Sequence, residues 1–325
     1  MVKLTALILF CLVFFPIRYT NDWNNYEYIT NNINDFNTDY VFTEITKYAI
    51  SKGYSFIDIY QFHIVMIGIF LIIFLSNFTH KIILIVLILI TYRYVQYANQ
   101  IRYYLGFFIW LYGSYCLLVN KKKLKGITLL SFSLLSHSAL LALFIFLPLY
   151  KYFKYITLRK QIIFYTCQIF LIPLVISISS AIFPQFSKYY SETQTSSIAG
   201  GLLYALPAIL ILIYITYISQ KNKHNNNEPK YYFLYSLSMF SFLLLPISLY
   251  YHLLMERYIY SFTVIWLTYV LYIHGESNKK KSISYLSSIL FISLIVILWF
   301  YFAPNVIGDT FYIKEVILMQ NSTNN

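Results

Sequence analysis

Long apolar blocks constrain this chain more than any other feature of its sequence. Most have about 15 to 22 residues, the length an α-helix needs to cross a bilayer. Charged residues make up 11% of the chain, against about 25% in a soluble domain, so helices of a soluble fold would lack polar faces. The sequence therefore predicts an all-α polytopic membrane protein with about 9–11 transmembrane helices. The predicted blocks are 4–17, 59–76, 82–95, 102–119, 126–149, 161–183, 200–219, 231–251, 258–273 and 282–303.

The hydrophilic segments between the blocks predict an orientation. Lysine-rich segments belong on the cytoplasmic side by the positive-inside rule, and they are 121–125, 151–160, 221–230 and 277–282. The acidic segments then lie on the outer side, including the 18–58 loop and the 304–325 tail. We expect residues 1–325 to form a single integral membrane domain. The net charge of +12 is explained by orientation and membrane lipids, so no nucleic-acid partner is expected.

The block 126–149 conflicts with this orientation, because lysine-rich segments that both look cytoplasmic flank it. One interpretation is a broken, re-entrant hairpin with its turn at Ser136-His137-Ser138. Each arm would be about 17 Å long, too short for the bilayer core of about 30 Å. The alternative is one long helix with His137 facing a neighbouring helix. We favour the hairpin, whose non-helical turn would line a polar cavity.

The 18–58 loop contains a predicted amphipathic helix. A helical stripe ends before Gly53, and its members are Val41, Phe42, Ile45, Tyr48 and Ala49. Such a stripe is typical of a helix that lies on the membrane interface.

Arginine is distributed differently from lysine. Four of the five arginines fall on the predicted outer side: Arg18, Arg93, Arg102 and Arg257. Guanidinium groups suit phosphate and carboxylate ligands, so Arg93, Arg102 and Arg257 are candidates for a pyrophosphate-binding site. The alternative for each is snorkelling to headgroups or pairing with an acid. We favour binding for Arg102 and Arg257, and snorkelling for Arg18.

Three side chains are candidates for acid–base chemistry. His137, Asp22 and Glu44 could each accept a proton from a sugar hydroxyl. The alternative for these acids, and for the nearby Glu27, is plain solvation of the outer loop. We favour this alternative for Glu27. No His or Cys has metal-site spacing, so no metal is expected. Nucleotide-binding and soluble catalytic motifs are absent from the sequence, and no cofactor is expected.

The segment 99–143 carries an ordered set of motifs. Arg102 is followed by a small residue, Gly106, then a helix, a basic break and a second apolar run that ends in His137-Ser138-Ala139. In this order the segment resembles the EpsG family of bacterial membrane proteins, the Wzy-type polymerases. The outer loop is similar to the family in Asp22 and Tyr26, with Glu44 in the position of a glutamate that precedes proline. The sequence departs from the family at Tyr103, Ser136 and Ile45.

The resemblance implies a glycosyltransferase of the inner membrane with its active site facing the periplasm. Such enzymes polymerise oligosaccharide repeat units carried on undecaprenyl pyrophosphate into O-antigen, capsule or exopolysaccharide, without ATP. The resemblance also implies an architecture compared with that of GT-C glycosyltransferases, and a chain-length regulator as a partner. Arg102 and Arg257, supported by Arg93, would stabilise the departing pyrophosphate.

Two other functions fit an outer site with arginine and histidine. A flippase of lipid-linked oligosaccharide would be longer, with internal repeats, and no repeat is present. A membrane acyltransferase that modifies the glycan would hold its histidine and arginine on the cytoplasmic side. Polymerase is therefore the favoured function.

Overall fold

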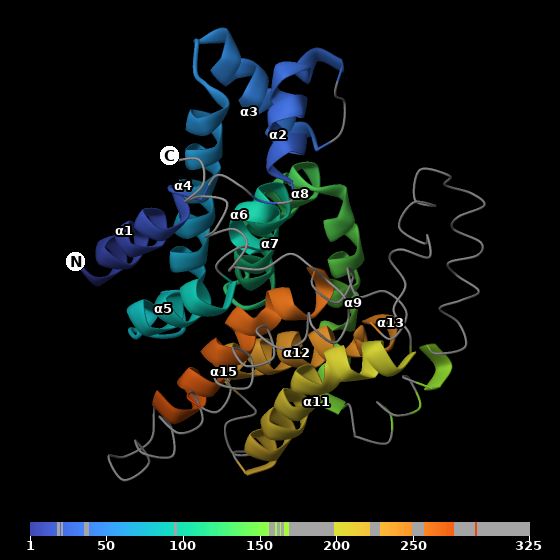
Figure 1. The fold of residues 1–325 in the computed structure, drawn as a ribbon. Helices are drawn as coiled ribbons and strands as arrows, with labels where there is room; N and C mark the ends of the chain where they lie inside the picture. Colours follow the sequence, from blue (N-terminus) through green and yellow to red (C-terminus); the bar gives the residue numbers. More distant parts are fainter. Residues whose placement is uncertain are drawn as a thin grey trace. The chain divides into compact units, whose positions relative to one another are not determined.

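The computed structural model describes residues 1–17, 20, 22–35, 39–93, 96–155, 198–221, 228–248 and 257–275, with isolated helical residues between 160 and 168 and at 290. All regular structure in these residues is helical, which confirms the predicted all-α class. The chain divides into two compact units (Figure 1), one containing Met1–Leu147 and the other beginning at Pro148. The single membrane domain stays a prediction.

The first unit contains a helix for each predicted block up to residue 149. They are α1 (Val2–Phe14), α4 (Phe56–Leu75), α5 (Ile82–Arg93), α6 (Gln96–Asn99), α7 (Ile101–Leu118), α8 (Lys123–Ser136), the 3-10 helix η2 (Ser138–Ile145) and α9 (Phe146–Leu149). Among the described residues α4 alone is long and apolar enough to cross a bilayer, and four shorter segments are apolar: Val2–Phe14, Ser138–Phe153, Ala205–Gln220 and Tyr260–Ile273. The predicted helix count therefore stays a prediction. Apart from isolated residues, the blocks 161–183 and 282–303 lie outside the described residues, as does the 304–325 tail.

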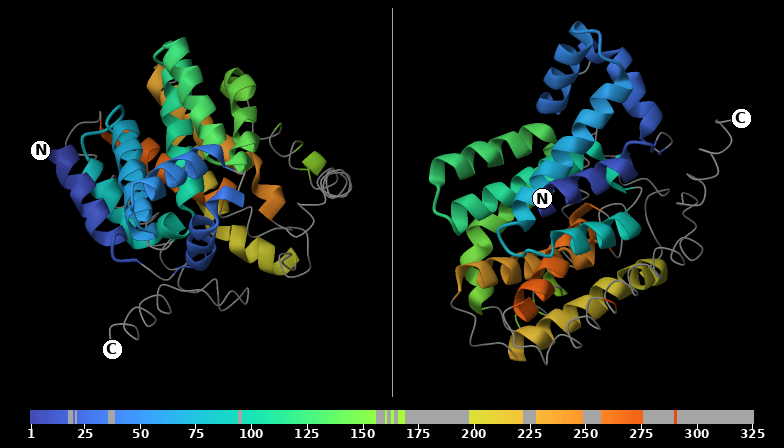
Figure 2. Two further views of the ribbon diagram at one scale, coloured as in Figure 1. Left: turned by 90° about the horizontal axis from the view of Figure 1, so that it is seen from above. Right: turned by 90° about the vertical axis from the view of Figure 1, so that its left-hand side faces the viewer.

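Helix α7 is the core of the first unit. Almost every side chain along it is buried, because α4 and α8 both pack against it while α1 packs on α4 and α5. Figure 2 shows α7 and α8 side by side. Small residues permit this close packing: a Cβ added at Gly113 would lie 3.1 Å from Leu129 Cβ, and one at Gly126 2.8 Å from Leu117 Cβ. These pairs show that α8 runs antiparallel to α7.

The helix breaks at His137. Its backbone is extended, with φ −160° and ψ 120°, between the last residue of α8 and the first of η2. A Cβ added at Gly106 would lie 3.1 Å from Ser136 Cβ and 2.4 Å from Leu140 Cδ1, so residues on both sides of the break meet the same point of α7. Further along α7, the rings of Trp110 and Phe146 are 5.8 Å apart.

The chain therefore reverses at the break and returns along α7. This geometry matches the predicted hairpin with its turn at residues 136–138 and excludes one long helix over 126–149. Whether the hairpin is re-entrant in a membrane stays a prediction.

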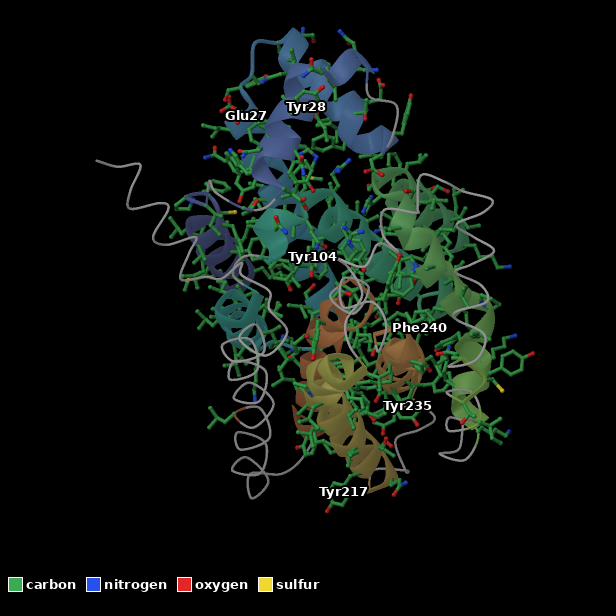
Figure 3. All side chains as sticks on the ribbon, turned by 45° about the vertical axis from the view of Figure 1, so that its right-hand side comes forward. Glu27, Tyr28, Tyr104, Tyr217, Tyr235 and Phe240 are labelled. Atoms are coloured by element: carbon green, nitrogen blue, oxygen red, sulfur yellow. The ribbon has the colours of Figure 1, made fainter. Side chains whose placement is uncertain are left out.

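The 18–58 loop contains α2 (Trp23–Asn31), the short 3-10 helix η1 (Ile33–Asp35) and α3 (Tyr40–Ser51). The predicted amphipathic helix is present, and Gly53 follows it with φ 81°. Its buried side chains are Phe42, Thr43 and Thr46, whereas Tyr48 of the predicted stripe is 67% exposed. An exposed Tyr48 does not contradict a stripe that faces a membrane interface, so the interfacial position of α3 stays a prediction. Within the unit, α3 packs against α8. On α2, Glu27 and Tyr28 are exposed, whereas Tyr104 lies inside the unit (Figure 3).

The described part of the second unit is also helical. It contains η3 (Tyr150–Tyr155), α11 (Ile198–Lys221), α12 (Pro229–Leu243), α13 (Leu245–Ser248), η7 (Tyr260–Phe262) and α15 (Thr263–Gly275). Helix α12 begins with proline, which suits a first helical position, and α15 packs against it. The rings of Phe242 and Trp266 stack at 5.1 Å between these two helices.

Candidate functional site

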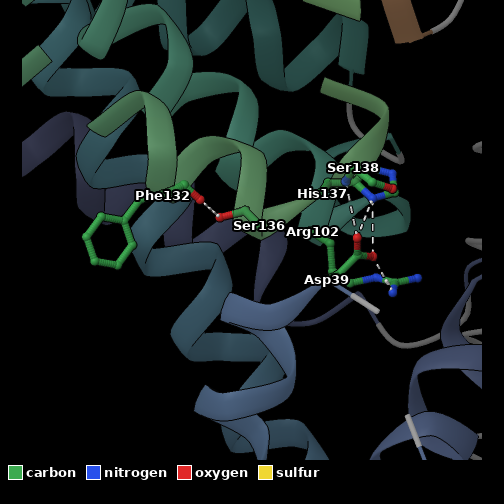
Figure 4. Close-up of polar contacts among 6 residues, drawn as sticks. All are labelled: Asp39, Arg102, Phe132, Ser136, His137 and Ser138. Atoms are coloured by element: carbon green, nitrogen blue, oxygen red, sulfur yellow. Dashed lines mark hydrogen bonds and ion pairs between the residues drawn. The ribbon is translucent and has the colours of Figure 1, made fainter. Parts of the chain in front are cut away.

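Three segments of the first unit meet at the carboxylate of Asp39 (Figure 4). Arg102 Nη1 donates to its Oδ2 at 2.7 Å. His137 Nδ1 lies 3.1 Å from Oδ1 and 3.2 Å from Oδ2, and the backbone N–H of Ser138 donates to Oδ1 at 3.3 Å. The loop helix α3, the start of α7 and the tip of the hairpin are thus joined through one acid.

Asp39 occupies the N-cap of α3 without capping that helix. Its backbone is left-handed, with φ 53° and ψ 63°, and its side chain makes no cap hydrogen bond. Asp tolerates this conformation better than most residues, yet the missing cap forgoes about 1 kcal/mol. The carboxylate is turned toward Arg102 and the hairpin instead of its own helix.

Arg102 lies in the first turn of α7, where the helix meets the loop. The centre of its guanidinium lies 5.0 Å from the ring centre of Tyr26 and 5.4 Å from that of Phe42. Aromatic faces attract a cation most strongly when water is excluded, and the Arg102 side chain is 17% exposed. Two rings and the Asp39 carboxylate surround the charge, and part of the Arg102 side chain stays exposed.

His137 stands at the turn of the hairpin because the chain leaves the helix there. Its ring meets that of Tyr103 edge to face at 5.9 Å, and 18% of its side chain is exposed. One ring nitrogen faces Asp39, so the other is directed away from the carboxylate. An imidazole in this setting can exchange a proton with a ligand.

The charge of Asp39 is stabilised by its neighbours. Burial alone would raise the pKa of its carboxyl group, but the hydrogen bond and charge of His137, the charge of Arg102 and the Ser138 N–H outweigh it. The net effect is a pKa below the ordinary 3.8. Asp39 is therefore an anion at neutral pH although its side chain is only 5% exposed.

A second histidine lies behind the site. His63 on α4 is fully buried, and its Nδ1 lies 2.8 Å from the carbonyl oxygen of Ile59. Its ring is 5.1 Å from that of Phe42, the same ring that supports Arg102. In the described part of the chain its Nε2 has no hydrogen-bond partner, and no three His, Cys, Asp or Glu side chains there gather as metal ligands.

The two predicted acids occupy different surroundings. Asp22 lies at the start of α2, where its backbone N–H donates to Asn99 Oδ1 at 2.8 Å, and its charge acts on Arg102. Glu44 is 48% exposed and lies 3.6 Å from Lys47 on the same helix. The structure brings Asp22 near Arg102 and leaves Glu44 on the surface of α3.

The other predicted arginines are not part of this cluster as described. Arg93 is the last residue of α5, and its side chain lies outside the described residues, as does Arg18. Arg257 belongs to the second unit, half-buried just before η7, where its carbonyl oxygen accepts a hydrogen bond from the Ser261 hydroxyl. The pyrophosphate role predicted for Arg93 and Arg257 stays a prediction.

Sequence reasoning missed Asp39, the residue that connects the site. Asp39 precedes α3 with a left-handed backbone, so a helical wheel does not place its side chain. An aspartate directly before a predicted amphipathic helix was the available signal.

Comparison with known proteins gives one match. The model of the EpsG family matches residues 1–313. No curated protein and no solved structure matches the chain.

Proposed function

This chain belongs to the EpsG family, and from that premise we propose that it polymerises oligosaccharide repeat units carried on undecaprenyl pyrophosphate, at the periplasmic face of the bacterial inner membrane. Family membership indicates a membrane protein with a polysaccharide polymerase-like role. The donor, the acceptor, the multi-pass topology and the periplasmic site are part of the proposal. A chain-length regulator is the expected protein partner.

The convergence of Arg102 and His137 on one carboxylate is the observation that supports this function best. Transfer of a glycan from a lipid pyrophosphate needs a cation at the leaving group and a base at the acceptor hydroxyl. The structure holds one group of each kind within hydrogen-bond reach of Asp39. Both side chains are partly exposed.

The reaction is a displacement at the anomeric carbon of the donor chain. The acceptor hydroxyl oxygen forms a bond to that carbon as the bond from carbon to pyrophosphate oxygen breaks. The bonding electron pair stays with the pyrophosphate, which gains one negative charge, and the hydroxyl proton passes to the base. Arg102 would stabilise the growing charge with those donors that Asp39 does not use.

Among the three predicted bases we assign the role to His137. Glu44 lies on the surface beside Lys47, and Asp22, an acid close to Arg102, would weaken binding of an anionic leaving group if it also had to approach the substrate. Arg257 and Arg93 would add positive charge to the pyrophosphate site. The hairpin would be re-entrant, with His137 at a wet cavity in which non-helical backbone is tolerated.

The proposal is tested by complementing a gene deletion and separating the surface glycan by length. Polymerase loss leaves single capped units, flippase loss leaves none, and acyltransferase loss leaves full-length chains without a modification. Arg102→Ala should give single capped units at a normal protein level. Lys47→Ala, which removes a partly exposed cation from α3, should restore long chains. A normal length distribution with Arg102→Ala would contradict the role of Arg102.

A further inference from the structure

We infer that Asp39 is the positioning residue of this site: it holds the imidazole of His137 with Nδ1–H toward itself, so that Nε2 is the atom that takes the acceptor proton. The catalytic meaning of this inference rests on the proposed function. The contacts between Asp39 and His137 do not depend on that function.

The hydrogen bonds around Asp39 determine which nitrogen bears the proton. Both carboxylate oxygens accept hydrogen bonds, from Arg102 at Oδ2 and from the Ser138 N–H at Oδ1. An ionised carboxylate has acceptors only. Nδ1 of His137, which lies 3.1 Å from Oδ1, must therefore be the donor, and the neutral ring then keeps its lone pair on Nε2.

Nε2 is the nitrogen left for a ligand. Among the described residues it makes no hydrogen bond, since both polar contacts of the His137 ring are made by Nδ1. The ring itself is oriented by two neighbours, the carboxylate on one side and the edge-to-face contact with Tyr103. A neutral imidazole fixed in this way is ready to accept a proton without first rotating.

The charges of the cluster suit a reaction that creates an anion. Arg102 and Asp39 carry opposite charges, so in the form of His137 that can act as a base, the neutral imidazole, the three side chains carry no net charge. When Nε2 takes the hydroxyl proton, the cluster becomes positive as the pyrophosphate gains its negative charge. Asp39 stabilises the imidazolium at that moment without itself becoming protonated.

The local structure of α3 agrees with a role beyond folding. A residue that served only the helix would cap it, yet Asp39 adopts a left-handed backbone and leaves the cap unmade. Strain of this kind is often retained at functional sites. Here it directs the carboxylate out of α3 and onto His137.

The test reads the protonated nitrogen directly. Full-length protein carrying 15N-histidine in lipid nanodiscs is studied by NMR, and His137→Gln identifies the His137 signals by difference. At an alkaline pH, where the ring is neutral, we expect an Nε2 shift typical of an unprotonated nitrogen in the wild type. Asp39→Asn and Asp39→Gly should both lose this preference. Both residues tolerate a left-handed backbone, so one variant serves if the other does not fold. Glu44→Gln, which changes an exposed acid on the same helix, should leave the His137 signals unchanged.

Turnover on a defined lipid-linked repeat unit is the second measurement. With Asp39→Asn, kcat should fall roughly 10²–10⁴-fold, the contribution of a general base, with little change in KM. Rescue by Asp39→Glu would support the positioning role further. An unchanged His137 tautomer in both Asp39 variants would overturn the inference. If the Asp39 variants lose the tautomer preference but the wild type never joins repeat units, the proposed function is rejected and the positioning by Asp39 stands.

Discussion

Arg102 Nη1 lies 2.7 Å from Oδ2 of Asp39, although 63 residues separate them in the chain. The ion pair fastens the loop helix α3 to the start of α7 at the place where the hairpin turns. Its members are nearly buried, so each leaves an uncompensated charge if the other is removed. The pair therefore serves both the folding of the loop and the electrostatics of the site.

Arg102→Lys should lose most of the function although it keeps the charge. A lysine cannot reproduce the planar fork that reaches Asp39 or the contact with the Tyr26 and Phe42 rings. We expect polymerisation to fall roughly 10²-fold, as misplaced catalytic groups do. Glycan length in the complemented deletion strain measures it, with protein level as the control. Long glycan chains made by Arg102→Lys at the wild-type rate would show that polymerisation does not depend on the exact position of the positive charge.

Acid should loosen the contact between α3 and the hairpin. The pKa of Asp39 lies below its ordinary value in the folded protein, so its ionisation stabilises the fold above the unfolded pKa near 3.8. That contribution is lost as the pH falls through the lower folded pKa. The unfolding temperature should fall as the pH is lowered from 7 to 3, and it should fall less steeply in Asp39→Asn than in the wild type. An equal dependence of the unfolding temperature on pH in both proteins would contradict the lowered pKa of Asp39.

Ser138 offers a comparison between backbone and side chain. Only its N–H contacts Asp39, so Ser138→Ala should retain activity. Ser138→Pro removes the N–H at the first position of η2, where proline is tolerated, and the extended His137 before it suits proline. A hydrogen bond to a charged group is worth about 1.5 kcal/mol or more, so turnover should drop roughly tenfold. Loss of activity in Ser138→Ala would argue for a role of the hydroxyl.

Gly106 sets the distance between α7 and both arms of the hairpin. Gly106→Ala should destabilise the protein by about 1–3 kcal/mol, because the new Cβ would lie 2.4 Å from Leu140 Cδ1 and 3.0 Å from the Ser133 carbonyl oxygen. Leu140→Ala in the same chain should recover part of the loss, which a double-mutant cycle of unfolding free energies measures. If the two substitutions change the free energy of unfolding additively, residues 106 and 140 are not in contact.

Periodicity and length predicted the helices of the first unit well. The block 126–149 was the difficult case, and a charge argument about its flanks predicted the break at His137 that the structure contains. The helix count across a membrane does not follow from these residues, since α4 alone among the described helices is long enough to span one.

The site was predicted only in part. Arg102 and His137 were identified from charge and position, and the structure brings them to one carboxylate. The identity of that carboxylate depends on which face of α3 packs against α8, a tertiary contact that local sequence does not determine. Thr43 and Thr46 are buried although neither contributes to an apolar stripe.

The reversal at His137 has a consequence for how the protein is made. Asp39 leaves the ribosome 98 residues before its histidine partner, an interval of about 5–20 s at bacterial synthesis rates. Until the hairpin has formed, the loop can make its salt bridge to α7 but not the contact between Asp39 and His137. Defects in hairpin insertion should therefore appear first as protease sensitivity of the nascent loop, before any loss of the remaining helices.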